Sequence, residues 1–267
     1  MSKILTTHVG SLPRSKGLSE ILFSKDRGEK FIKEDFNNIL KKNVETIVKK
    51  QIEVGIDYIS DGEMSKISYA TYIKDRIDGF SGESERRAPA DLDDFPEYKE
   101  KIAKSGGTPT YSRPCCTNAL KIKDKDSLNK DLENFKNSLD KNNHQKAFMN
   151  AASPGVINVF MPNRFYKTDD EYLHKLSEIM AIEYETITKS NIQVQLDCPD
   201  LALARHMNFK ELSEQEFLKR AEIQIECLNE ALTNVDVNMT RMHICWGNYE
   251  GPHTHDIPLE KILPIIL

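Results

Sequence analysis

The sequence predicts an α/β fold in which helices alternate with parallel strands. Three observations support this prediction. Amphipathic helical patterns are repeatedly followed by short apolar runs, polar residues gather directly after those runs, and 267 residues suit one large α/β barrel or two smaller domains. Ligands of parallel α/β folds bind at the carboxyl ends of the strands, so the clustered polar residues are expected to form a site there.

The first clear helix and strand follow one another in residues 36–63. Apolar side chains recur at three- and four-residue steps over residues 36–54, which predicts an amphipathic helix that ends before Gly55. The run GIDYISDGE then predicts a strand that carries polar residues, Glu63 among them, at its carboxyl end.

The same order recurs twice later in the chain. Thr168 with Glu171, and Ser213 with Glu216, have the spacing of a capping box at a helix start. The runs IQVQLDCP and RMHICWGN follow these helices and predict two further strands.

We therefore expect six strands, at residues 4–8, 58–61, 111–117, 147–151, 194–197 and 242–245. Residues 81–110 are polar and lack clear periodicity, which predicts a long loop or a small insertion within a single domain that spans residues 1–267. The last residues, 262–267, are largely apolar and predict the start of a helix or a packing surface.

Composition excludes several classes of function. The net charge is −5, with no basic arm or Lys/Arg block, so nucleic acid is not an expected partner. The opening residues lack the pattern of a targeting peptide, and no run is long enough for a membrane span, so we expect a cytoplasmic protein. Five cysteines, an odd number, argue against a disulfide framework.

The motif HIC at residues 243–245 has two interpretations. Side chains two residues apart in a strand point to the same face, so His243 and Cys245 could bind one metal ion. Cysteine is also one of the most frequently buried residues, and the same tripeptide is compatible with an ordinary core strand. The motif by itself leaves both interpretations open.

Four separated motifs resemble the catalytic domain of the cobalamin-independent methionine synthases and its short single-domain relatives. They are TTHVGSLPR, DYISDGEMSKISYATYIKDRIDGF, QVQLDCPDLAL and HICWGNYEG, and they occur in the family's order and spacing over nearly the whole chain. The resemblance implies a (βα)8 TIM barrel with a zinc site at its C-terminal face. It also implies transfer of a methyl group from a methyltetrahydrofolate-type donor, such as 5-methyltetrahydropteroyltriglutamate, to the thiol of homocysteine, giving methionine.

The resemblance also implies a substrate site. His8, Gly10 and Ser11 fall in the family's turn after the first strand, which holds the amino acid substrate. Glu63 and Asp197 match two carboxylates that bind the substrate ammonium. This agrees with elementary chemistry, because an α-amino acid needs anionic partners for its ammonium and hydrogen-bond donors for its carboxylate.

The resemblance also implies residues that bind the metal and the folate. His243 and Cys245 match the first two zinc ligands. Arg113 with Cys115 or Cys116, in SRPCC, matches an Arg-Cys pair near the folate. The chain departs from the full synthases at Cys198, and the family's folate-contacting acid falls on Leu203.

The family's other two zinc ligands and its catalytic histidine are expected beyond Leu267. The resemblance therefore implies a barrel that is incomplete at its C-terminus, with about six βα units and no catalytic residue within the chain. His253, His255 and Asp256 are the local residues that could replace the missing ligands.

Two alternatives remain. One is an alkyltransferase for another thiol, of the coenzyme M type, or for another methyl donor; a sulfonate substrate lacks an ammonium and would favour basic residues such as Arg14 and Arg113. The other is an inactive barrel fragment, or a subunit that needs a partner chain. The sequence does not fix the oligomeric state.

Overall fold

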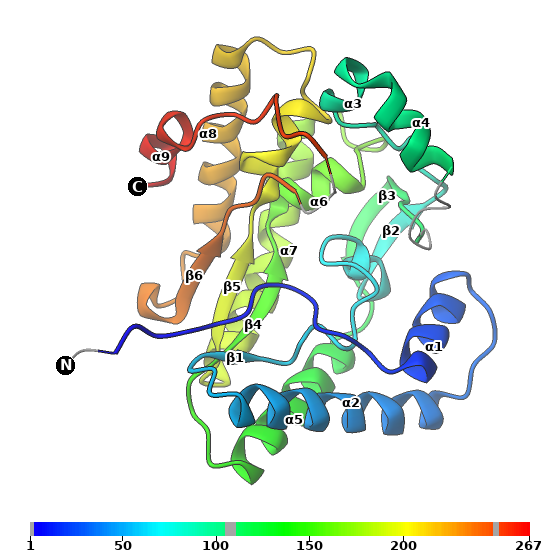
Figure 1. Ribbon diagram of the computed structural model, residues 1–267, viewed down its shortest axis with the longest axis vertical. Coiled ribbons are helices and arrows are strands. Elements are labelled where there is room, and N and C mark those ends of the chain that lie inside the picture. The colour runs from blue at the N-terminus through cyan, green and yellow to red at the C-terminus, as the bar shows by residue number, and fades with distance from the viewer. Residues whose placement is uncertain (1–2, 105–110, 248–250) are drawn as a thin grey trace.

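The computed structural model describes residues 3–104, 111–247 and 251–267. Its central element is a parallel sheet with the strand order β1-β4-β5-β6 (Figure 1). The strands are β1 (Ile59–Ser60), β4 (Ala147–Ala152), β5 (Gln193–Asp197) and β6 (Thr240–His243). A parallel bridge between Thr7 and Tyr58 places the N-terminal segment beside β1. The predicted α/β class with a parallel sheet is therefore confirmed.

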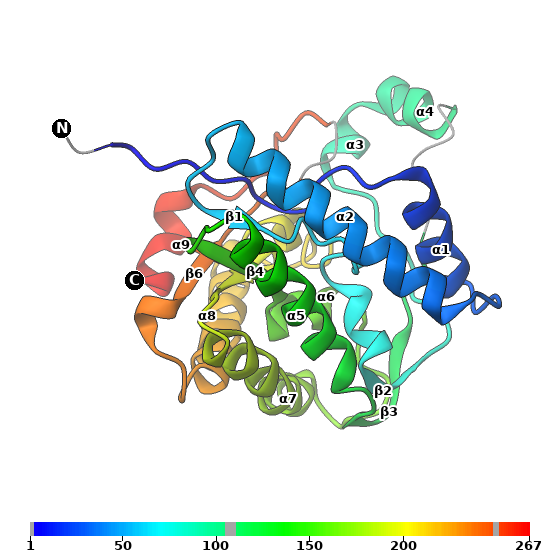
Figure 2. The ribbon, with the colours of Figure 1, turned by 90° about the horizontal axis from the view of Figure 1, so that it is seen from below.

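Helices connect the strands and cover the sheet. They are α1 (Lys16–Asp26), α2 (Lys33–Glu53), α3 (Asp91–Asp94), α4 (Pro96–Lys104), α5 (Asp126–Lys141), α6 (Pro154–Phe160), α7 (Asp169–Lys189), α8 (Glu214–Ala231) and α9 (Leu259–Ile266), with 3-10 turns η1 (Thr71–Asp75), η2 (Pro199–Leu201), η3 (Leu203–His206) and η4 (Val237–Met239). Helix α2 packs beside α5, and α7 packs beside α8 (Figure 2).

The two faces of β4 and β5 differ in character. Met149 and Leu196 belong to the hydrophobic core that the helices cover. Asn150, Gln195 and Asp197 alternate with these residues and are buried, although they are polar. Because successive side chains of a strand point to opposite faces, the polar residues share the face away from the helices. This polar face holds much of the candidate site.

Four of the six expected strands lie in the parallel sheet, and residues 4–8 contribute only the Thr7–Tyr58 bridge. The strand expected at residues 111–117 is β3 (Cys115–Ile122), and it pairs antiparallel with β2 (Ile77–Ser81) in a separate two-stranded sheet. Strand β2 was missed because its IDGFS run is short and is interrupted by Gly79, where the pairing register shifts. Gly79 has φ +112, and a Cβ there would lie 2.8 Å from Leu120, so glycine allows the strands to approach.

Strand β6 begins and ends earlier than expected. It covers Thr240–His243, and Cys245 lies beyond its end. Within the described ranges the parallel sheet remains open, with β6 at one edge and the N-terminal segment at the other.

Both predicted helix starts are confirmed. The Thr168 hydroxyl accepts a hydrogen bond from the Glu171 amide at the start of α7. Ser213 and Glu216 form a complete capping box at the start of α8. These contacts satisfy backbone amides that have no partner within the helix.

The segment 81–110 contains α3 and α4, and its residues 105–110 lie outside the described part of the chain. The apolar C-terminal stretch forms α9, as expected, and buries Ile262 in a small cluster with Phe217. Among the helices of the described residues, none combines the length and apolar character that a bilayer crossing requires.

Candidate functional site at the strand ends

The carboxyl ends of the parallel strands bring together residues that are far apart in the sequence. Glu63 follows β1, Asp197 ends β5, and His243 ends β6. Asp197 and His243 are paired in the sheet register. All these strands run in the same direction, so their ends meet at one edge of the sheet.

Glu63 is almost completely buried, at 1% exposure, in a tight turn. Its own φ is +55, and Gly62 before it has φ +68, so the turn uses left-handed backbone at two successive positions. The guanidinium of Arg14 holds this turn, because Nη2 donates to the carbonyls of Glu63 and Lys66 at 2.7 Å each. The conformation directs the Glu63 carboxyl into the interior.

The Glu63 carboxyl is incompletely satisfied. The Ser11 hydroxyl donates to Oε2 over 3.3 Å. Oε1 is buried and has no hydrogen-bond partner among the described residues. Gly10, with φ +72, faces this oxygen, since a Cβ there would lie 3.9 Å from it. A buried carboxyl oxygen without a donor is costly, and a bound group that donates a hydrogen bond would relieve that cost.

Asp197 is held by amides rather than by cations. The side-chain amides of Asn150 and Gln195 donate to its carboxylate over 3.0 and 2.9 Å. Lys66, which is also buried, donates its ammonium to the backbone carbonyl of Asn150 and lies 4.3 Å from the centre of the Tyr72 ring. The Asp197 carboxylate is thus fixed in orientation by neutral groups.

The two carboxyls influence each other. Burial raises the pKa of Glu63 to about 7, and the nearby Asp197 adds to the shift while Lys66 opposes it. Burial also raises the pKa of Asp197, against the hydrogen bonds from Asn150 and Gln195 and the attraction of His243. Two desolvated carboxyls close together form an environment that favours a cationic guest.

His243 and Cys245 are both partly buried at the end of β6. The Gly247 amide donates to the Cys245 sulfur over 3.1 Å. In the described residues, neither side chain belongs to a group of three or more potential metal ligands. Of the local substitutes, His253 and Asp256 contact each other at 3.1 Å, and His255 contacts Asp94 at 2.6 Å.

His8 lies near α2. It is partly buried and lines a cavity of about 600 Å³ between the N-terminal segment and α2, together with Leu12 and Ile47. The structure therefore brings Ser11, Glu63, Asp197 and His243 toward one another and leaves His8 beside α2.

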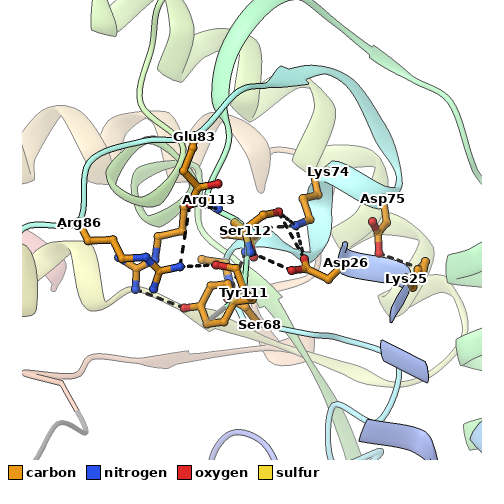
Figure 3. A network of polar contacts seen from close by, with 12 residues as sticks. Lys25, Asp26, Ser68, Lys74, Asp75, Glu83, Arg86, Tyr111, Ser112 and Arg113 are labelled. Atoms are coloured by element: carbon orange, nitrogen blue, oxygen red, sulfur yellow. Dashed lines mark hydrogen bonds and ion pairs between the residues drawn. The ribbon is translucent and has the colours of Figure 1, made fainter. Parts of the chain in front are cut away.

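Arg113 and Cys115 differ in their accessibility. Cys115 is fully buried in β3. Arg113 precedes β3, and its guanidinium lies 4.7 Å from the centre of the Phe160 ring and 5.5 Å from that of Tyr111. Figure 3 shows how this segment is anchored: Lys74 binds Asp26 and Ser112, and the Arg113 amide donates to Glu83 over 3.1 Å.

Tyr69 connects the two regions. Its ring packs edge-to-face on Phe160 with centroids 5.5 Å apart, so it shares that ring with Arg113. Burial raises the pKa of its hydroxyl, and Tyr111, Cys245 and Asp197 lie near enough to alter it further. The sequence reasoning missed Tyr69, Asn150 and Lys66.

A signal was available for some of these missed residues. Polar residues inside otherwise apolar strands, as in AFMNAA and IQVQLD, indicate a buried polar face. Tyr69 and Lys66 lie in a turn-rich segment without periodicity, so the sequence gives no comparable signal for them.

Comparison with known proteins gives a consistent result. The family described as "Cobalamin-independent synthase, Catalytic domain" matches residues 4–88. Over 260 residues the chain is 26% identical to a methionine synthase of Sulfolobus acidocaldarius and 23% identical to one of Saccharolobus solfataricus, covering 96% of this chain each time. It spans 66% and 68% of those relatives, respectively.

The fold has a counterpart among solved structures. A B12-independent methionine synthase from Shewanella sp. W3-18-1, in complex with selenomethionine, superimposes with a TM-score of 0.63 at 16% identity, over 91% of this chain and 61% of that one. This likeness concerns the fold. The family match and the relatives confirm the resemblance that the four motifs indicated: the chain is similar to the cobalamin-independent methionine synthases.

Proposed function

We propose that this protein is a zinc-dependent methyltransferase that moves a methyl group from a methyltetrahydrofolate-type donor to the thiol of homocysteine, giving methionine. The observation that carries this proposal is the pair of buried carboxyls, Glu63 and Asp197, at the carboxyl ends of β1 and β5. The resemblance to methionine synthases supplies the reaction class.

The carboxyls would bind the substrate ammonium. An ammonium has three donors, and Glu63 Oε1 is a buried acceptor without a partner in the described residues. Binding a cation there would favour the ionised form of Glu63. Ser11, which already touches the Glu63 carboxyl, would help orient the amino acid, so that its sulfur is presented in a fixed direction.

His243 and Cys245 would supply two ligands to zinc. Their nitrogen and sulfur donors suit this ion, and bound zinc stabilises a thiolate near neutral pH. A catalytic zinc site normally has three protein ligands. We therefore propose that at least one further ligand comes from a residue other than His243 and Cys245. The parallel sheet is open at both of its edges among the described residues. Together with the fold likeness, this supports a (βα)8 barrel that is completed by further strands.

The cations beside Glu63 and Asp197 give no support to the rival sulfonate thiol. That substrate would need cations in place of an ammonium clamp. The Arg14 guanidinium is engaged with the backbone carbonyls of Glu63 and Lys66, and the Lys66 ammonium is engaged with Asn150. Two buried carboxyls would also repel a sulfonate placed beside them.

The test is a methyl-transfer assay. The protein is incubated with Zn²⁺, homocysteine and methyltetrahydrofolate, as monoglutamate and as triglutamate, each with an isotopically labelled methyl group. Labelled methionine, detected by mass spectrometry and abolished by Cys245→Ser, is the expected result. Labelled product that is unchanged in Cys245→Ser would contradict the zinc assignment. No labelled product from either donor would contradict the proposed activity of this chain and favour the inactive-barrel alternative.

A further inference from the structure

A second cluster of metal-ligand side chains lies away from the strand ends, where α7 packs against α8. It consists of His174 on α7 and of Cys227 and Glu230 on α8. One potential ligand atom from each residue lies within 4.8 Å of the other two. Among the residues that the structure describes, it is the only group of three or more potential metal ligands found. It shares no residue with the candidate site above.

The distances within the cluster suit one ion. His174 Nδ1 lies 2.8 Å from Glu230 Oε2 and 3.9 Å from Cys227 Sγ. Tetrahedral zinc bonds imply about 3.4 Å between nitrogen and oxygen ligands, and about 3.6 Å between nitrogen and sulfur ligands. The His174–Glu230 distance would have to open by about 0.6 Å and the His174–Cys227 distance to close by about 0.3 Å, which small side-chain rotations allow.

The backbone around the cluster is well supported. Cys227 and Glu230 are three residues apart on α8, so they face the same side of that helix. Hydrogen bonds from Arg220 to Asp170, at 2.9 Å, and from Asn234 to Glu185, at 3.0 Å, tie the two helices together before and after the cluster. The ligands are thus presented from fixed positions.

The three side chains differ in their exposure to solvent. Cys227 is fully buried, whereas the side chains of His174 and Glu230 are 54% and 52% exposed. An ion could thus approach from solvent between His174 and Glu230 and reach the sulfur beneath them. Without an ion the His174–Glu230 contact is an ordinary surface hydrogen bond over a core cysteine, and such exposed contacts contribute little to stability.

We propose that His174, Cys227 and Glu230 form a zinc site that joins α7 to α8 on the outside of the fold. A nitrogen, sulfur and carboxylate set suits Zn²⁺ better than Mg²⁺ or Ca²⁺, which prefer oxygen ligands. Water would complete the four-coordinate ion. Because the metal links two helices, its binding stabilises the folded chain.

The test uses the full chain with His243→Gln and Cys245→Ser, so that the strand-end site cannot contribute. Co²⁺ titration of this protein should show a thiolate-to-cobalt absorption band that saturates at one ion per chain, and Zn²⁺ should abolish the band and raise the melting temperature. Adding His174→Gln should weaken Co²⁺ binding more than about 100-fold and remove the thermal shift.

His174 is exposed, so its replacement should leave the fold intact. Glu178→Gln, which replaces another exposed α7 side chain, serves as the matched control and should bind like the parent. Absence of a cobalt band in the parent, or a band that His174→Gln leaves unchanged, would overturn the proposal.

Discussion

Replacing Glu63 with glutamine should change the pH dependence of folding in a defined direction. Burial raises the pKa of Glu63 from 4.5 to about 7 in the folded chain. The folded state therefore holds the proton more tightly than the unfolded state. The contribution of Glu63 to the free energy of unfolding is greatest below pH 4.5, falls as the pH rises toward 7, and is constant above that value.

The size of the effect follows from the same shift. The difference between about 7 and 4.5, at about 1.4 kcal/mol per unit, corresponds to about 3 kcal/mol. Glutamine is neutral and cannot lose a proton, so Glu63→Gln avoids this loss. Its free energy of unfolding, relative to wild type, should increase by about 3 kcal/mol between pH 4.5 and pH 8.

Urea unfolding at a series of pH values measures this difference. Glu53→Gln is the matched control, because its carboxylate is 61% exposed at the end of α2 and keeps its hydration on folding. The control should show no comparable gain at high pH. A Glu63→Gln variant whose stability follows the pH curve of wild type would show that the carboxyl is not desolvated as described.

Three further predictions concern the groups around the carboxyls. Arg14→Met should lose the hydrogen bonds to both carbonyls and cost about 1–3 kcal/mol in urea unfolding, with an unchanged midpoint arguing against the role of Arg14 in holding the turn. Gly62→Ala should lower the free energy of unfolding by about 1–3 kcal/mol, because φ is +68 and the new Cβ would lie 2.9 Å from Met64. A calorimetric melting temperature equal to that of wild type would show that the turn tolerates a side chain. Asn150→Leu should weaken homocysteine binding about tenfold, since it removes one of the two amides that orient Asp197, and equal affinity in a titration would exclude that role.

The sequence predicted the local elements of this fold better than their pairing. Helical periodicity and capping spacing located α2, α7 and α8, because both depend on residues within one or two turns. The partner of a strand depends on residues far away in the chain. The strand beginning at Cys115 therefore could not be assigned to its hairpin with Ile77–Ser81 from its own residues.

The residues of the candidate site that lie directly after a strand could be predicted from the sequence. Glu63 and Asp197 lie where apolar runs give way to polar residues, and the structure places them within electrostatic reach of each other. The residues that orient them, Asn150 and Arg14, act through contacts across 47 and 49 positions of sequence. No local pattern reports such contacts.

The cluster on the outer helices illustrates the same limit. In the sequence, His174 lies 53 residues before Cys227, so ligand spacing along the chain could not associate them. Only the packing of α7 against α8 brings them together. Spacing arguments find sites within one element, whereas sites between elements require the fold.

The most direct test of the central claim is the binding of two thiols that differ in their charged group. Titration calorimetry compares homocysteine with 2-sulfanylethanesulfonate, in the presence of Zn²⁺, for wild type and for Glu63→Gln. We expect wild type to bind homocysteine and Glu63→Gln to bind it at least about tenfold more weakly. Neither protein should bind the sulfonate appreciably. Preference for the sulfonate, or equal homocysteine affinity in both proteins, would contradict the claim that the buried carboxyls recognise an ammonium.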